Sequence, residues 1–278
     1  MSIRSAVVAG HFYPGDKTTL ENELKKYLIP HKKINNAIAV IAPHAGYIYS
    51  GKTAGAVYSS IDIPDTVFIM CPNHTGLGYP ISLHPAEHWT TPLGEIQSNQ
   101  NILKEIKNKI PQAEFDKSSQ LREHSLEVQL PFIQTLNPDA KIVPITLAGL
   151  PFEMIQKLGV LIADIMIGLE KLGKKSLIVA SSDMTHFESK DSAKYKDELA
   201  IERIKKLDTK GFMDILQEKD ISVCGLYPIS VTIEAMLNYS DKLGKNIYVK
   251  LVDYSNSGEV TGDTNDVVAY AGLVLYHD

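Results

Sequence analysis

The chain has 278 residues, of which 44% are hydrophobic and 22% charged, and this composition excludes an intrinsically disordered protein. Its net charge of −5 comes from 28 basic and 33 acidic residues, without the basic stripe that nucleic-acid-binding proteins carry. Two cysteines are too few for a disulfide framework, and no window holds the roughly 20 apolar residues of a membrane span. We therefore expect a cytoplasmic protein with no nucleic-acid partner and no membrane segment.

Predicted helices and apolar strands alternate along the chain. Helices are predicted over residues 16–28, 51–61, 98–110, 124–136, 151–171, 191–207, 210–217 and 227–239. Strands are predicted over residues 37–42, 66–71, 141–147, 176–181, 246–254 and 267–276. This alternation, with wholly apolar strands, is typical of a mostly parallel sheet covered by helices on both faces. We predict a single three-layer α/β/α domain over residues 1–278, in which the last two strands form an antiparallel edge.

Prolines affect the prediction in three stretches of the chain. Pro131 is expected to bend the helix over residues 124–136 or to mark its start. Pro144 lies inside a predicted strand, where it removes a hydrogen-bond donor. Pro85 opposes a helix in the stretch "HPAEHWTTPLG", which we predict to be a surface loop that walls the pocket.

Histidine follows three of the apolar strands at the point where each strand ends. His44 lies in "PHAGY", His74 in "PNHTG", and His186 lies with Asp183 in "DMTHF". Each histidine alone is more typical of a turn or packing residue. Ligands of open α/β sheets bind beyond the carboxyl ends of the strands, so we expect the three imidazoles to converge. Because imidazole is the commonest metal ligand, the pattern predicts a metal pocket.

A catalytic metal site usually has three protein ligands, and the candidate third ligand is a cysteine. Cys224 lies just before a predicted helix, where the helix dipole favours a thiolate. The alternative is a small buried hydrophobic residue, which is the interpretation we adopt for Cys71. The stretch "EHSLEVQLPF" carries Glu123 and His124, and an amphipathic helix explains most of it. We expect His124 at most to line the pocket and not to bind metal.

Several common motifs do not occur in this sequence. It contains no Walker A motif, no G-x-G-x-x-G after a strand, no G-x-S-x-G, no C-x-x-C and no H-E-x-x-H. These absences argue against the commonest NTPases, dehydrogenases, serine hydrolases and zincins.

Six motifs, taken in order, carry a resemblance to a known family. They are "AGHFYPGD", "IAPHAGYIYSG", "CPNHTG", "EHSLEVQLPF", "SSDMTHF" and "CGLYPI". Over nearly the whole chain the sequence resembles the Memo-like protein family. That family is similar in fold to class III extradiol ring-cleaving dioxygenases, which are non-haem Fe(II) enzymes.

The resemblance implies roles for five residues. His44 and His74 match metal-binding histidines, and Cys224 matches the family's cysteine, which stands where the dioxygenases place a carboxylate ligand. His186 matches the histidine that serves as acid/base in the dioxygenases, and Asp183 is implied as a pocket residue. The implied cofactor is Fe(II) or copper, with zinc as the alternative. The implied partners are a radical-SAM protein and a protein of the AMMECR type, beside an unidentified small-molecule or peptide ligand.

The cysteine departs from the dioxygenase pattern and leaves three functions open. A thiolate is softer than a carboxylate, so it favours Cu(I) or zinc over a hard-ligand Fe(II) site. The first function is a metal-dependent oxidoreductase of dioxygenase-like type. The second is a binding protein that kept the pocket and works through partners. The third is a zinc-dependent hydrolase.

Overall fold

A computed structural model describes residues 2–278 of the chain. In this part of the chain twelve strands form one sheet: β1 (Ile3–Arg4), β2 (Ala37–Ala42), β3 (Thr66–Pro72), β4 (Ile81–Leu83), β5 (His88–Thr91), β6 (Gly94–Ser98), β7 (Ala113–Phe115), β8 (Lys141–Leu147), β9 (Ser176–Ser181), β10 (His186–Glu188), β11 (Ile247–Asn256) and β12 (Val267–His277). The strand order is β1-β5-β6-β8-β3-β9-β2-β12-β10. Strand β11 pairs with β12, whereas β4 pairs with β7 and β8.

The centre of the sheet is parallel. Strands β8, β3, β9 and β2 run side by side in one direction, so their carboxyl ends meet at one edge. Strand β12 is antiparallel to β2 and to β11, which confirms the predicted antiparallel pair at the end of the chain. Pro144 lies within β8 opposite Ile69, so the predicted strand forms around it.

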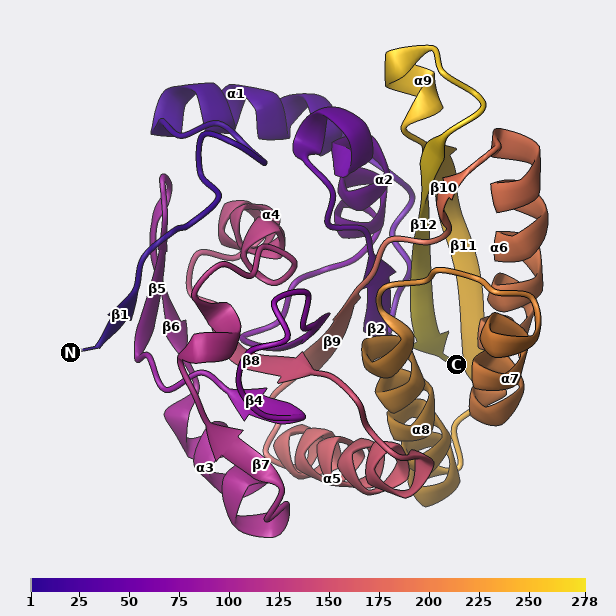
Figure 1. Cartoon of the computed structure of the whole chain (residues 1–278). Coiled ribbons are helices and arrows are strands. Elements are labelled where there is room, and N and C mark those ends of the chain that lie inside the picture. Colours follow the sequence, from indigo (N-terminus) through magenta and orange to yellow (C-terminus); the bar gives the residue numbers. More distant parts are fainter. Residues whose placement is uncertain (1) are drawn as a thin grey trace.

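Helices cover both faces of the sheet (Figure 1). In the described residues the α-helices are α1 (Lys17–Tyr27), α2 (Tyr47–Ser59), α3 (Gln100–Lys109), α4 (Leu130–Leu136), α5 (Phe152–Lys171), α6 (Lys190–Lys205), α7 (Thr209–Glu218), α8 (Leu226–Leu243) and α9 (Gly258–Thr261). Short 3₁₀ turns occur at Ser118–Gln120 and Glu127–Gln129. Several helices start at a polar side chain that accepts a hydrogen bond from the first turn, as Asp16 does at α1 and Ser189 at α6.

Alternate residues of each central strand pack into two separate cores. In β2, Val40 and Ala42 pack with residues of α1, α2 and α4. Ala39 and Ile41 face the opposite core, which contains residues of α3, α5, α6, α7 and α8. Because both faces of these strands are buried, the strands are apolar throughout. The predicted three-layer α/β/α fold is confirmed.

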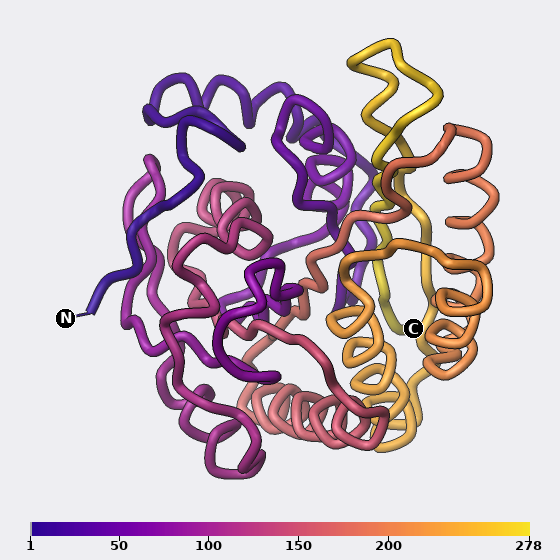
Figure 2. Tube along the Cα trace, in the orientation of Figure 1, coloured from indigo at the N-terminus to yellow at the C-terminus, as the bar shows by residue number. Residues whose placement is uncertain are grey.

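The path of the chain places its two described ends on opposite sides of the molecule (Figure 2). Near the N-terminus, β1 pairs in parallel with β5 at one border of the sheet. The chain ends in β12, beyond the parallel strands. Within residues 2–278, no helix is both long and apolar enough to cross a membrane.

The helix predicted over residues 124–136 is wrong in its first half. A turn and the 3₁₀ turn at Glu127–Gln129 precede α4. The N–H groups of His124 and Ser125 donate to the Glu123 side chain. The next hydrogen bonds are mixed, from Val128 N–H to the His124 carbonyl and from Gln129 N–H to the Leu126 carbonyl, so the regular α-helix begins only at Leu130. Pro131 lies in the first turn of α4, so it marks a helix start, which is one of the two outcomes expected.

The surface loop predicted around Pro85 is also wrong. Trp89 lies in strand β5 and is fully buried, because alternate residues of this strand face the core. His84 is 5% exposed, and its ring centroid lies 5.1 Å from that of Trp89. The Arg4 guanidinium covers the same indole at 4.6 Å from the ring centroid. This stretch therefore leads into the β5–β6 hairpin, which packs against the core near the border of the sheet.

Candidate metal centre

Three predicted ligands meet at the carboxyl edge of the parallel strands. His44 follows β2, His74 follows β3, and Cys224 precedes α8. One ligand atom from each lies within 4.8 Å of the other two. Cys224 Sγ lies 3.2 Å from His44 Nε2. The structure brings these side chains together; their role as metal ligands stays a prediction.

Hydrogen bonds fix which nitrogen of His44 carries the proton. Ser181 Oγ donates its only proton to the carbonyl oxygen of Ser125 at 2.6 Å, and it accepts from the Gln129 amide at 2.9 Å. The hydroxyl therefore also accepts from His44 Nδ1, which lies 2.9 Å away. His44 Nε2 is left without a proton and faces Cys224. Burial holds the pKa of His44 well below its usual value, so the ring is neutral.

His74 is held in the same tautomer by a buried carboxylate. Glu123 is fully buried, and its Oε1 lies 2.9 Å from His74 Nδ1 while its Oε2 accepts from the His74 backbone N–H at 2.7 Å. Burial lowers the pKa of His74, but its hydrogen bond to Glu123 and the charge of Glu123 outweigh burial and raise it. Nδ1 is therefore the proton donor to Glu123, and Nε2 is the nitrogen that a cation could bind in place of a proton. Carboxylates commonly orient metal-binding histidines in this way.

The approach of α8 to β9 places Cys224. A Cβ atom on Gly225 would lie 2.2 Å from Ser182 Cβ, so only glycine fits between the start of α8 and the end of β9. The Asp183 backbone N–H donates to Cys224 Sγ at 3.1 Å. Burial and the charge of Asp183 raise the pKa of the thiol, so without a cation it keeps its proton and donates it to His44 Nε2.

Asp183 and His186 lie beside this centre on the segment after β9. Asp183 is buried, and its Oδ1 accepts from the His44 backbone N–H at 2.7 Å. Burial raises its pKa to about 6, although the His44 N–H opposes the shift. His186 donates from Nδ1 to the Ser222 carbonyl oxygen at 2.9 Å and from its backbone N–H to Ser222 Oγ at 2.8 Å. Its Nε2 is consequently the nitrogen that can accept a proton.

His124 belongs to the wall of the centre. Its ring stacks on that of His74 at 4.9 Å between centroids and contacts the ring of Phe12 at 4.5 Å. Burial lowers its pKa to about 4, so it is neutral. This agrees with the expectation that His124 lines the pocket.

His74, Glu123 and His124 also bring ligand atoms within 4.8 Å of one another. That trio is poorly suited to a metal ion, because Glu123 Oε1 already accepts from the backbone N–H groups of His124 and Ser125 and from the Ser125 hydroxyl. The stacked imidazoles lie at an interplanar angle of 18°, so their lone pairs do not converge. In this trio, Glu123 binds and His124 stacks on the imidazole of His74, so both hold its ring in place.

The other group fits a metal ion by the chemistry of its donors. Two imidazoles whose Nδ1 atoms are bound elsewhere and one thiol form a donor set that binds zinc or copper and leaves room for further ligands. The proton between Cys224 Sγ and His44 Nε2 stands where a cation would replace it. Cys71 is fully buried near Gln120 and Thr146, as expected for a packing residue.

Sequence reasoning missed three residues of the centre: Glu123, Ser181 and Gln129. The stretch that carries Glu123 and Gln129 is explained mostly by an amphipathic helix in the sequence, yet both residues are fully buried. The one available signal was the row of polar residues inside the otherwise apolar stretch "EHSLEVQLPF". Ser181 gave no signal, because a serine at the end of a strand is ordinary.

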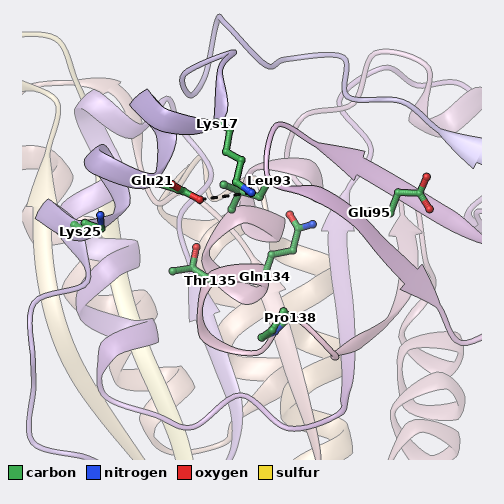
Figure 3. Close-up of a pocket in the computed structure, with 8 residues that line it drawn as sticks. All are labelled: Lys17, Glu21, Lys25, Leu93, Glu95, Gln134, Thr135 and Pro138. Carbon is green, nitrogen blue, oxygen red and sulfur yellow. Dashed lines mark ion pairs between the residues drawn. The ribbon is translucent and has the colours of Figure 1, made fainter.

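A hollow of about 460 Å³ lies elsewhere, between α1, the β5–β6 hairpin and the end of α4 (Figure 3). Lys17 and Glu21 line it and form an ion pair at 3.9 Å between exposed side chains, which contributes little to stability. It contains none of the histidines described above.

Comparison with known proteins identifies the family. The family model described as Memo-like protein matches residues 4–274. A MEMO1 family protein of Aquifex aeolicus is 40% identical over 279 residues, covering 99% of this chain and 100% of that protein. A MEMO1 family protein of Methanosarcina barkeri is 40% identical over 275 residues, covering 98% and 100%.

A solved structure shares the fold. The uncharacterized protein JW3007 from Escherichia coli K12 superposes with a TM-score of 0.53 and covers 86% of this chain and 99% of that chain. Its sequence identity of 12% supports a likeness of fold alone. From the family model and the two curated relatives it follows that the chain belongs to the Memo-like protein family.

Proposed function

We propose that this protein is a metal-dependent oxidoreductase that holds one redox-active ion, iron or copper, between His44, His74 and Cys224. One observation carries the proposal. Two imidazoles have their Nδ1 atoms bound elsewhere, which leaves Nε2 as the ligand atom of each; His44 Nε2 lies 3.2 Å from Cys224 Sγ, and ligand atoms of His44, His74 and Cys224 lie within 4.8 Å of one another. A packing role for Cys224 requires no such matched pair of tautomers.

Each residue has a distinct task in this proposal. The bound ion supplies electron transfer and an open position for substrate. Glu123 and Ser181 orient the two imidazoles, and the backbone N–H of Asp183 orients the thiol. His186 accepts or returns a proton at Nε2, because Ser222 holds its Nδ1–H.

A zinc-dependent hydrolase is the second candidate, because two histidines and one cysteine also form a zinc site. The same donor set then lowers the pKa of a bound water instead of changing oxidation state. Metal analysis of protein purified without added metal separates the two candidates. Stoichiometric zinc together with esterase or amidase activity supports the hydrolase, and iron or copper with turnover of O₂ supports the oxidoreductase.

The two cysteines give a matched test of the ligand set. Cys224→Ser removes the soft anionic ligand, whereas Cys71→Ser changes a fully buried thiol that is not in the ligand set. Mutation of a residue that orients a metal ligand typically lowers metal affinity by about 10–100-fold. Because Cys224→Ser removes a ligand itself, we expect a larger loss of affinity. Cys71→Ser should bind metal as wild type does. Metal content by mass spectrometry measures both, and full metal retention by Cys224→Ser contradicts the ligand set.

His186→Ala tests the division between binding and proton transfer. Because His186 is not in the ligand set, we expect the variant to keep its metal. In O₂-consumption assays with catechols and small thiols, turnover should fall by roughly 10²–10⁴-fold, the usual contribution of a general acid or base. If His186→Ala loses its metal while Cys224→Ser keeps it, the roles are reversed and the centre has three histidine ligands.

A further inference from the structure

Phe187 is an aromatic residue in an unfavourable position. It lies in β10 directly after His186, with φ of 58°, a left-handed conformation that bulky side chains rarely adopt. Its side chain is also 76% exposed, so burial in a core does not offset the backbone strain. Strain of this kind concentrates at functional sites.

The other left-handed residues have ordinary explanations. Besides the glycines, they are Asn36, Asp220 and Leu207 in the described residues. Asparagine and aspartate tolerate this conformation because their short side chains bond locally. Leu207 follows the end of α6 and packs against the core, so burial offsets its strain. Phe187 has neither explanation.

The strained backbone holds the Phe187 ring beside the ring of His186. Successive side chains of a regular strand point to opposite faces. The pairing of β10 with β12 is irregular between His186 and Glu188, and the rings of His186 and Phe187 lie only 5.8 Å apart. The irregular backbone between His186 and Glu188 thus places the rings of His186 and Phe187 on the same side of β10. His186 is itself bound to Ser222, two residues before Cys224.

Other exposed apolar side chains lie in the first turn of α2, shortly after His44, and on the loop after His74. Ile48 and Tyr49 follow His44 and are 64% and 39% exposed. Leu77 and Tyr79 follow His74 and are 46% and 50% exposed. Single exposed apolar residues are common on protein surfaces. Here they recur within five residues of each histidine, as Phe187 does beside the third.

We propose that Phe187 is a specificity-determining residue, which packs on a flat apolar group, preferably an aromatic ring, of a small ligand whose polar end reaches the metal. This inference rests on the proposed function. The strained backbone is retained because it holds the phenyl ring beside His186, where the ligand enters. The ligand class is accordingly a small molecule with a metal-binding end and an aromatic body.

Exogenous metal ligands test this inference without knowledge of the natural substrate. Protein loaded with Co(II) is titrated with imidazole and with 4-phenylimidazole, and the visible absorption of cobalt reports binding. We expect wild type to bind the phenyl compound about 10-fold more tightly, since aromatic contacts add to the apolar area buried. The ratio of the two affinities should fall towards one in Phe187→Ala and Phe187→Gly, and Phe187→Trp should retain it.

Two controls separate this role from a structural one. Leu172→Ala removes another large apolar side chain, 73% exposed, in the loop after α5, and should leave the ratio unchanged. Phe187→Gly removes the strain, so its thermal midpoint should not fall below that of wild type. Equal affinities for both compounds in wild type, or an unchanged ratio in Phe187→Ala, overturn the inference. If cobalt is not retained or imidazole does not alter its absorption, the proposed function fails and the inference fails with it.

Discussion

Two buried carboxyl groups beside the ligand histidines differ in the pKa that their hydrogen bonds give them. Burial disfavours the charged form of both. For Glu123, hydrogen bonds from His74 and Ser125 outweigh burial and lower its pKa to about 2. For Asp183, the opposing hydrogen bond from the His44 N–H is weaker than burial, and its pKa is raised to about 6. Glu123 is therefore a permanent anion that can fix the proton of His74 at Nδ1 at any physiological pH.

Glu123→Gln should loosen metal binding without removing a ligand. The amide presents a weaker acceptor to His74 Nδ1, so the imidazole loses both orientation and basicity. We expect about 10–100-fold weaker metal affinity, measured by competition with a chelator of known affinity. Asp197→Asn is the matched control, because Asp197 is also fully buried but contacts neither ligand histidine. Equal losses in both variants would show that any buried carboxylate matters and that Glu123 has no specific role.

His84→Asn should reduce the decrease in the free energy of unfolding that wild type shows as the pH falls. Burial, with the charge of Arg4, lowers the pKa of His84 to about 4 from its ordinary 6.5. A base with a lowered pKa in the folded state takes up its proton mainly on unfolding, so wild type loses stability as the pH falls from 6.5 to about 4. A shift of this size corresponds to about 3 kcal/mol.

Urea unfolding at pH 7 and at pH 4.5 measures this effect. Asn at position 84 offers an oxygen to the Ala86 N–H, which His84 Nδ1 accepts at 3.2 Å in wild type. Loss of the ring lowers stability at both pH values, so the quantity that matters is the difference between them. His31→Asn, at an exposed histidine, should keep the wild-type difference. The prediction is wrong if the two variants show the same difference.

At the residue scale, sequence predicted the histidines and missed their supports. His44 and His74 could be found because each follows an apolar strand, and the rule for parallel sheets then places them together. Glu123 lies 49 residues from His74 along the chain, and no periodicity joins the two. A buried carboxylate becomes visible only when its hydrogen-bond partners are known.

At the scale of elements, buried carboxylates fasten three segments around the centre. Glu123 holds the loop after β3 through His74. Glu127 accepts from Arg4, Tyr13 and the backbone of Val8, and so holds the N-terminal segment that carries Phe12. Asp197 of α6 holds the loop after β9. Loops at the ends of the strands are thereby fixed to elements outside the sheet.

Asp197→Ala should destabilise the protein more than Asp197→Asn. Asp197 accepts from the Thr185 N–H and hydroxyl at 3.0 and 2.6 Å and from the Tyr254 hydroxyl at 2.7 Å. Alanine leaves these buried donors unpaired, which costs about 3 kcal/mol or more. Asparagine keeps an acceptor for Thr185 and removes a charge that is unfavourable to bury, since burial raises the pKa of Asp197.

Urea unfolding followed by circular dichroism ranks these variants. Tyr254→Phe removes a single donor and should cost least. If Asp197→Asn is as unstable as Asp197→Ala, the negative charge itself is essential and the hydrogen-bond argument is wrong.

The sequence predicted the strands that are buried on both faces, and it missed the short strands and the turn before α4. The four central parallel strands are apolar on both faces, so their sequences identify them. Strands β4 and β5 have three and four residues, too few for a clear period. The segment before α4 has helical spacing, but its hydrogen bonds alternate between α and 3₁₀ types, so it forms a turn and a 3₁₀ turn.

At the scale of the whole molecule, the sheet divides the protein into two cores, and the candidate metal centre lies at one edge of the sheet, at the carboxyl ends of the parallel strands. The layer architecture followed from the alternation of helices and apolar strands. The strand order did not, because adjacency of β9 to both β2 and β3 depends on contacts between segments more than 100 residues apart. That adjacency is what brings Asp183 and His186 beside the histidines from β2 and β3.

Metal binding should therefore stabilise the whole fold. An ion held by His44, His74 and Cys224 links the ends of β2 and β3 to the start of α8, and it binds the folded chain in preference to the unfolded one. A free-metal concentration 100 times the Kd adds about 2.7 kcal/mol to the free energy of unfolding. For a chain of this length, that raises the thermal midpoint by about 5 °C.

Differential scanning calorimetry with and without Zn²⁺ or Cu²⁺ measures the shift, and a chelator should reverse it. Cys224→Ser should show a much smaller shift and Cys71→Ser the full one. An equal rise in Cys224→Ser would mean that the stabilising ion binds elsewhere, for instance at exposed carboxylates, and that the centre described here does not hold it.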